Sequence, residues 1–237
     1  MPKSKKRSRP QVTVVMPVYN SARYLAQSIE SVLKQNFDSF ELVIYDDGSK
    51  DDSCRIAKEY QRRDLRVRVC WGEENRGVAH ARNKIVDLAR GKYLALHDAD
   101  DIMLAGRLKR QAALLDRLPD VGVVIGKALT LDARVRKLTG QERSGVRDKK
   151  QTRFFSRTGR IKRFSSGPNS AVMLRKELVL EAGGCDERMK IASDMDLLRR
   201  LALKTQFYYI DAFFYVYRVH SKSLTARFTR SGHEKNK

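Results

Sequence analysis

Short apolar runs alternate with amphipathic stretches along the first part of the chain. Apolar positions three or four residues apart, such as Leu25, Ile29 and Val32, predict helices, whereas short runs of β-branched residues predict strands. This alternation is typical of a mostly parallel sheet with helices on both faces, so we predict an α/β fold with a Rossmann-like central sheet. The predicted strands are 12–16, 40–45, 67–71, 93–97 and 121–125, and the predicted helices are 21–35, 52–63, 78–89 and 104–118.

The rest of the chain is less regular and predicts a smaller, mixed region. Helices are expected at 175–182 and 194–203, and strands at 207–210 and 213–217. We expect a single domain with five consecutive parts: a basic disordered tail (1–10), a first half (11–126), a basic loop or insertion (127–165), a second half (166–226) and a frayed tail (227–237).

The charge of the chain favours an anionic partner. Its 49 Lys and Arg against 28 Asp and Glu give a formal net charge of +21. Such a charge suits a nucleic acid, an anionic membrane surface or an acidic glycan, and does not choose among them. The basic residues concentrate at 3–9 and between Arg134 and Arg163, although such runs are more often solvated segments. We expect the first run to give peripheral contact with anionic lipid.

Several protein classes are excluded or disfavoured. No apolar run approaches the length of a membrane span, and no apolar segment follows the basic N-terminus as in a secretory signal. The three cysteines lie far apart, which argues against a disulfide framework or a thiolate zinc site and favours a cytoplasmic location. Neither a GxGxxG motif after the first strand nor a P-loop is present.

Polar clusters follow each of the first four predicted strands. They are Tyr19-Asn20, Asp46–Ser49, Asn75–Gly77 and Asp98–Asp101. Because the carboxyl ends of parallel strands meet at one edge of the sheet, these clusters predict a binding site there. Tyr19 is suited to stacking on a base, and Asp47 to accepting a hydrogen bond from a uracil imide N–H. The alternative for Asp47 is an ordinary Asp-Gly-Ser turn.

The spacing of Asp98 and Asp100 is that of a DxD motif, and carboxylate oxygens are the ligands that Mg²⁺ and Mn²⁺ prefer. The alternative is a solvated turn that caps the following helix. His220 is a candidate third metal ligand or phosphate contact. Arg218 is a candidate phosphate contact, with a surface ion pair as its alternative. Asp194, in the first turn of a predicted helix, is either a general base or a helix N-terminal charge.

The ordered set of motifs resembles family 2 glycosyltransferases, inverting enzymes with the GT-A fold of the nucleotide-diphospho-sugar transferase superfamily. The resemblance covers about residues 11–225. The matching stretches are Met16–Asn20, Asp46–Ser49, Asn75–Gly77, Ala81–Asn83, Asp98–Asp101, Gly183–Glu187, Asp194–Leu197 and Tyr217–His220.

This resemblance implies transfer of a sugar from a nucleotide-diphosphate donor, usually a UDP-sugar, with Mn²⁺ or Mg²⁺ as cofactor. The expected acceptor is a hydroxyl of a glycan or cell-surface polysaccharide, which the basic stretch predicts to be anionic. Asp194 corresponds to the catalytic base, and Asp98, Asp100 and His220 form the expected metal set, with Asp100 the direct ligand. The expected donor-binding residues are Pro17, Tyr19, Asp47, Gly77, Arg82, Asp98, Asp100 and Arg218.

Two other functions remain open at this stage. A nucleic-acid-binding α/β protein would explain the charge, but the carboxylate clusters would repel phosphate, so we regard a nucleic-acid partner as unfavoured. A catalytically silent relative would keep the fold and bind only the donor or a partner.

Overall fold

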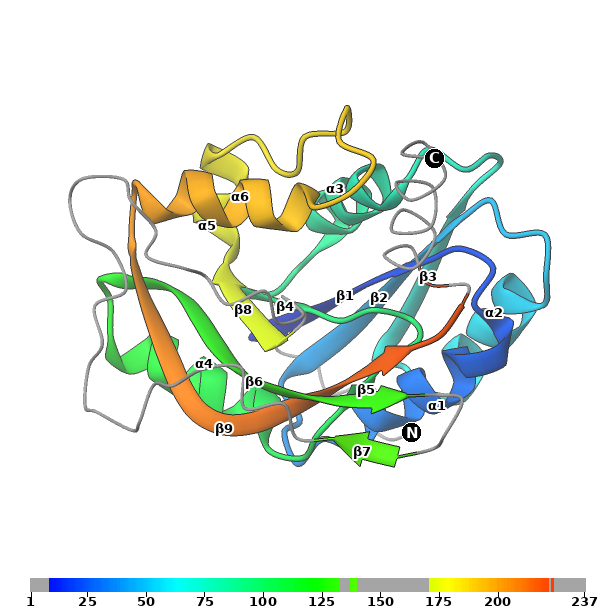
Figure 1. The fold of residues 1–237 in the computed structure, drawn as a ribbon, viewed down its shortest axis with the longest axis horizontal. Helices are drawn as coiled ribbons and strands as arrows, with labels where there is room; N and C mark the ends of the chain where they lie inside the picture. Colours follow the sequence, from blue (N-terminus) through cyan, green and yellow to red (C-terminus); the bar gives the residue numbers. More distant parts are fainter. Residues whose placement is uncertain (1–8, 133–136, 140–170, 222, 224–237) are drawn as a thin grey trace, which may run out of the picture.

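The computed structural model describes residues 9–132, 137–139, 171–221 and 223. Its first half builds a parallel sheet in the order β3-β2-β1-β4, with helices joining successive strands (Figure 1). The strands are β1 (Val12–Val18), β2 (Phe40–Asp47), β3 (Val67–Gly72) and β4 (Tyr93–Leu96), and the joining helices are α1 (Ala22–Leu33), α2 (Ser53–Arg63) and α3 (Val78–Leu88). The carboxyl ends of these strands therefore lie on one edge.

The second half continues the same sheet with strands of mixed direction. The order runs β4-β8-β6-β9-β5, and β7 pairs with the last residues of β6, beyond the part of β6 that pairs with β8. Strand β8 is antiparallel to both neighbours, whereas β9 is parallel to β6. The strands are β5 (Ile102–Met103), β6 (Val121–Asp132), β7 (Lys137–Thr139), β8 (Val172–Arg175) and β9 (Gln206–Val219), and the helices are α4 (Arg107–Arg117), α5 (Lys176–Glu181) and α6 (Ser193–Ala202). The predicted α/β class with a mixed second region is confirmed.

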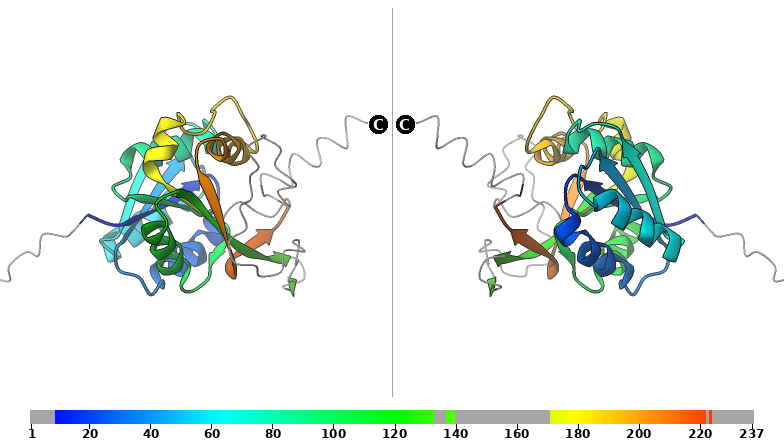
Figure 2. Two further views of the ribbon diagram at one scale, coloured as in Figure 1. Left: turned by 90° about the vertical axis from the view of Figure 1, so that its left-hand side faces the viewer. Right: turned by 90° about the vertical axis from the view of Figure 1, so that its right-hand side faces the viewer.

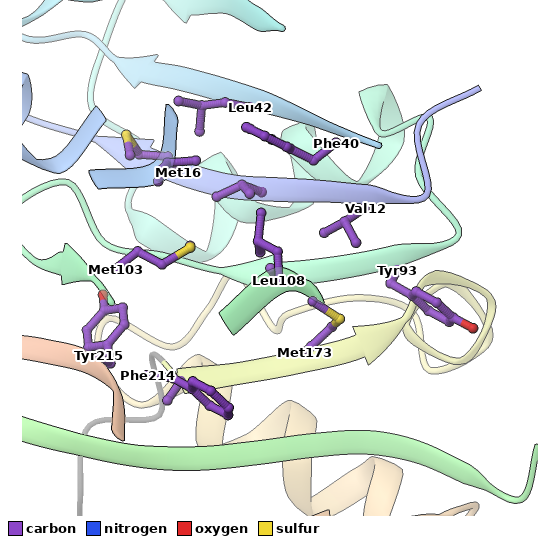
Figure 3. Close-up of a cluster of buried hydrophobic side chains, with 14 of the residues drawn as sticks. Val12, Met16, Phe40, Leu42, Tyr93, Met103, Leu108, Met173, Phe214 and Tyr215 are labelled. Carbon is purple, nitrogen blue, oxygen red and sulfur yellow. The ribbon is translucent and has the colours of Figure 1, made fainter. Parts of the chain in front are cut away.

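The two faces of the sheet carry separate cores because strand side chains alternate in direction. In β1, Val14 and Met16 pack with residues of α1, α2 and α4, as the close-up in Figure 3 shows for part of this cluster. Val15 points to the opposite face, where it joins residues of α3, α5 and α6. Figure 2 shows these helices on the two sides of the sheet. This packing fixes the strand ends that carry the polar clusters.

Some boundaries differ from the prediction. Residues 127–132, predicted as the start of a basic loop, continue strand β6 because they pair with β9. The two strands predicted at 207–210 and 213–217 form one long strand, β9, which pairs with β6 through register shifts near Gly126. The short strands β5, β7 and β8 are not predicted at all. Most of the expected insertion and of the N-terminal tail, and all of the C-terminal tail, lie outside the described residues.

The structure also bears on membrane-spanning helices and on the cysteines. No helix within the described ranges combines the length and apolar composition needed to cross a bilayer. Cys54, Cys70 and Cys185 are free thiols in the structure.

Candidate functional site

Asp47 ends strand β2 and is almost fully buried. Its Oδ2 atom accepts hydrogen bonds from the backbone N–H groups of Arg76 at 3.0 Å and Gly77 at 2.7 Å. Gly77 has φ +99°, a conformation that glycine adopts without steric cost. The Oδ1 atom of Asp47 is buried without a hydrogen-bond partner. An unpaired buried acceptor is costly, so this oxygen is suited to accept a hydrogen bond from a bound ligand.

The loop after β1 is tied to the loop after β2. Asn20, which has φ +49°, donates its backbone N–H to Ser49 Oγ at 2.9 Å, and its Oδ1 accepts from the N–H of Lys50 at 2.8 Å. Tyr19 lies in this fixed loop with 38% of its surface exposed. Pro17 lies two residues earlier within β1, in register with Tyr45. The structure thus places Pro17 and Tyr19 at the same edge as Asp47, with an exposed ring.

Arg82 lies between two carboxylates that are distant in sequence. Its Nη2 atom donates to Asp98 Oδ1 at 3.1 Å, and its Nη1 atom lies 3.7 Å from Asp194 Oδ2. Burial opposes the charge on Arg82, but Asp194 and Asp98 outweigh it and raise the pKa of the guanidinium. Burial in turn raises the pKa of Asp98, an effect that Arg82 opposes. One buried cation therefore joins the cluster after β4 to helix α6.

Asp194 occupies the first turn of α6, and its side chain is about one-fifth exposed. Its Oδ1 atom accepts a hydrogen bond from the N–H of Met195 at 2.9 Å, which leaves Oδ2 toward Arg82. The N-terminal end of a helix stabilises negative charge. Asp194 is therefore held by one hydrogen bond at the start of α6 and faces Arg82 with its other oxygen.

The fold brings together Asp100 and His220, which are 120 residues apart in sequence. His220 Nε2 lies 2.8 Å from Asp100 Oδ2, and the two side chains are 14% and 26% exposed. The ring of Tyr24, from α1, lies 4.9 Å from that of His220. A carboxylate and an imidazole are both accepted ligands of Mn²⁺, so this pair fits part of a metal site.

The full predicted metal set of Asp98, Asp100 and His220 is not assembled. Asp98 turns to Arg82, and within the described part of the chain no group of three His, Cys, Asp or Glu side chains is placed to hold a metal. A divalent ion bound by Asp100 and His220 would take its other ligands from diphosphate and water, as Mg²⁺ commonly does.

Arg218 holds the loop that carries Asp100. Its backbone N–H donates to Asp101 Oδ1 and its Nε donates to the carbonyl of Asp100, both at 2.7 Å. Its Nη2 donates to Gln27 Oε1 at 2.6 Å, and the guanidinium lies 4.5 Å from the ring centre of Tyr24. These contacts place Arg218 as a structural support of the loop that carries Asp100, and its role in phosphate binding stays a prediction.

Other residues of the site escaped sequence reasoning. Tyr215 of β9 accepts a hydrogen bond from the backbone N–H of Asp98 at 2.9 Å. Asn83 binds the chain before α6 through Cys185 and Glu187. The motif around Arg82 contains Asn83, but no local pattern in the sequence indicates Tyr215 as a partner of Asp98.

Comparison with known proteins agrees with this architecture. Residues 13–176 match the family described as Glycosyl transferase family 2. The uncharacterized glycosyltransferase MJ1057 of Methanocaldococcus jannaschii is 29% identical over 242 residues, which cover 97% of this chain and 81% of that protein.

Two solved structures share the fold. S. aureus TarS in complex with UDP superposes with a TM-score of 0.69 at 23% identity, covering 89% of this chain and 61% of that chain. The mannosyltransferase PcManGT from Pyrobaculum calidifontis, in complex with GDP-Man and Mn²⁺, superposes with a TM-score of 0.69 at 18% identity, covering 94% and 61%. The chain thus spans about three-fifths of these solved chains. The fold is the GT-A fold, and by its sequence the chain belongs to glycosyl transferase family 2.

Proposed function

We propose that this chain is an inverting glycosyltransferase that moves a sugar from a UDP-sugar to a hydroxyl of a glycan or cell-surface polysaccharide. The observation that carries the proposal is the position of Arg82 between Asp98 and Asp194. It brings a helix N-terminal carboxylate, suited to act as a base, next to the DxD cluster. A donor held at that cluster would present its anomeric carbon close to the base.

The uracil ring of the donor nucleotide is proposed to bind at Asp47. The unpaired Oδ1 is suited to accept the imide N–H of uracil, while Gly77 and Arg76 hold the other oxygen of the same carboxylate. The exposed ring of Tyr19 offers a surface for stacking, and Pro17 shapes the strand that leads to it. TarS, which shares the fold, has been solved with UDP.

The diphosphate is proposed to lie at Asp100. Asp100 and His220 would hold Mn²⁺ or Mg²⁺, with Asp98 nearby on the same loop. When bound, such an ion neutralises charge that develops on the leaving diphosphate. Arg218 keeps this loop in place through Asp100 and Asp101.

Asp194 is proposed to act as the general base. Its Oδ2 would accept the proton of the acceptor hydroxyl, whose oxygen then forms a bond to the anomeric carbon from the face opposite UDP. The bond between that carbon and the diphosphate oxygen breaks, and UDP leaves with the electron pair, so the configuration inverts. Arg82, 3.7 Å away, holds the carboxylate in place.

The acceptor and the location are proposed from charge. The net charge of +21 suits an anionic polysaccharide, and the basic residues at 3–9 suit peripheral contact with anionic lipid at the cytoplasmic face of a membrane. Removal of residues 1–10 should weaken cosedimentation with phosphatidylserine vesicles; unchanged cosedimentation would refute the role of this segment.

Calorimetric titration of UDP, with and without Mn²⁺, tests the donor site. We expect Mn²⁺-dependent binding that is lost in Asp100→Ala and retained in Asp194→Asn. Asp194→Asn should at the same time lower sugar transfer by roughly 100- to 10,000-fold, as expected for a lost general base. Absence of UDP binding under both conditions, or full activity of Asp194→Asn, would refute the proposal.

A further inference from the structure

The connection between α5 and α6 carries Asp194 into place but has little core of its own. Of residues 182–192, only Cys185 is buried, and the segment from Glu187 to Ala192 is largely exposed. In Figure 1 this segment (gold) passes over α3 before α6 begins. An exposed connection without regular structure keeps a fixed position only if polar contacts anchor it.

Asn83, on α3, supplies such an anchor. Its Oδ1 accepts the backbone N–H of Cys185 at 2.8 Å, and its Nδ2 donates to the carbonyl of Cys185 at 2.9 Å. One side-chain amide thus satisfies both backbone groups of a single residue, as a neighbouring strand would. Nδ2 also donates to Glu187 Oε1 at 3.0 Å. We call these three hydrogen bonds the Asn83 clamp.

Glu187 extends the clamp toward the nucleotide side. Its Oε2 lies 3.0 Å from His80 Nδ1 and 3.7 Å from Arg76 Nη2. Arg76 is the residue whose backbone N–H binds Asp47, and His80 lies in the first turn of α3. Hydrogen bonds from Asn83 and then His80 lower the pKa of Glu187, so the carboxylate stays ionised in this arrangement.

The glycine beside the clamp fits its geometry closely. A Cβ atom at Gly184 would lie 2.6 Å from Asn83 Oδ1, and Gly184 has φ +70°. Any larger residue would therefore press on the clamp and strain the backbone. Asn83 and Gly184 are matched parts of one contact between α3 and the connection.

Arg82 and Asn83 are neighbours on α3 that hold the same segment at two places, Asp194 and Cys185. We propose that Asn83 is a positioning residue for catalysis, which fixes the connection so that Asp194 meets the donor in the correct place; the inference rests on the proposed function. Asn83 acts through Asp194 and touches neither sugar nor nucleotide.

Release of UDP from UDP-sugars, with water as acceptor, tests the catalytic effect in the full chain. UDP-glucose, UDP-galactose and UDP-GlcNAc are compared, and the best substrate of the wild-type chain is used. Asn83→Ala should lower kcat by roughly 100-fold, as a small misplacement of a base does, while the Kd for UDP stays near the wild-type value. Asp87→Ala, at an exposed position of the same helix, is the control. An unchanged kcat, or a Kd that weakens as much as kcat falls, would overturn the proposal.

Hydrogen exchange tests the clamp without any activity. In Asn83→Ala the amides of residues 183–192 should exchange faster, and in Asp87→Ala at the wild-type rate. Glu187→Gln, which keeps the contacts with Cys185, should give a smaller increase. Unchanged exchange in Asn83→Ala would overturn the clamp. Failure of the wild-type protein to release UDP from any of the three UDP-sugars would refute the proposed function. The hydrogen-exchange result would still decide whether Asn83 holds the connection.

Discussion

The guanidinium of Arg82 lies 3.7 Å from the carboxylate of Asp194, across 112 residues of sequence. Arg82 belongs to α3, which packs on β1 and β2, whereas Asp194 begins α6 in the second half of the chain. Because Arg82 also holds Asp98, the two halves meet at one cation. Asp98 and Asp194 are thus positioned by a shared partner and not independently.

Replacing Arg82 should impair both activity and stability. In Arg82→Ala the carboxylates of Asp98 and Asp194 lose their common cation, which costs up to about 3 kcal/mol of unfolding free energy for such buried pairs. Transfer should fall by roughly 100-fold. Arg82→Lys keeps the charge but not the fork geometry, so we expect an intermediate effect. Urea denaturation and initial rates measure both quantities, and equal rates for Arg82→Ala and the wild type would contradict the role.

Asp47→Asn should weaken nucleotide binding while the fold persists. The asparagine oxygen can still accept from Arg76 and Gly77, but an NH₂ group then replaces the free acceptor. A lost hydrogen bond to a charged group is worth about 1.5–3 kcal/mol, or roughly 10- to 100-fold in Kd for UDP. The control is Asp38→Asn, an exposed position before the other end of β2. Calorimetric titration with UDP measures the Kd of each variant. Equal affinities for both variants would exclude Asp47 from the uracil-binding site.

His220→Ala should raise the Mn²⁺ concentration needed for UDP binding. If His220 shares the ion with Asp100, its loss removes one ligand, and we expect a shift of roughly tenfold in the half-saturating Mn²⁺ concentration. Chelation with EDTA should abolish UDP binding in the wild type. A titration of Mn²⁺ that is identical in His220→Ala and the wild type would restrict His220 to a hydrogen bond with Asp100.

Asp101 should make stability depend on pH. Burial, followed by the charges of Asp100 and Asp98, raises the pKa of Asp101 well above 3.8. Above pH 4 the unfolded chain releases this proton while the folded chain keeps it. Folding then binds a proton, so the contribution of Asp101 to stability falls as pH rises toward its folded pKa.

Asp101→Asn removes that dependence, because the amide is neutral in both states and its oxygen can still accept from the N–H of Arg218. The stability of the variant relative to the wild type should therefore increase from pH 4 upward and level off above the folded pKa. Urea denaturation between pH 4 and pH 8 measures the difference. Asp87→Asn controls for the loss of one exposed carboxylate, and a difference that does not change with pH would refute the assignment.

Local patterns predict the first half of the fold well. Strands β1 to β4 and helices α1 to α3 each carry their own periodicity, and the parallel arrangement places Asp47 and Asp98 at one edge without any knowledge of contacts. The second half is harder because its strands are defined by their neighbours. Strand β8 has only four residues and is a strand because β4 and β6 flank it. Asp211 in the middle of β9 suggests a turn, since Asp is depleted in strands, yet Ile210 and Phe213 on either side of it pair with β6 and keep one strand.

The partners of the site residues were the least predictable feature. Arg82 and His220 are identified as candidates from the motifs, but neither motif indicates that Arg82 faces Asp194 or that His220 faces Asp100. These pairs depend on how α3, α6 and β9 pack, which involves residues more than 100 positions apart. For the same reason, the sequence does not reveal that Arg82 donates a hydrogen bond to Asp98, one of the three predicted metal ligands.

Strand β9 also sets the order in which the site can form during synthesis. The contacts of Asp47 with Arg76 and Gly77 need no residue beyond Gly77, so they can form once Gly77 has left the ribosome. Asp101 must wait for Arg218, which is added 117 residues later, roughly 5 to 25 s at ordinary rates of translation. Until then the acidic loop after β4 lacks the strand that holds it. A nascent chain can therefore form the contacts of Asp47 well before those of Asp101.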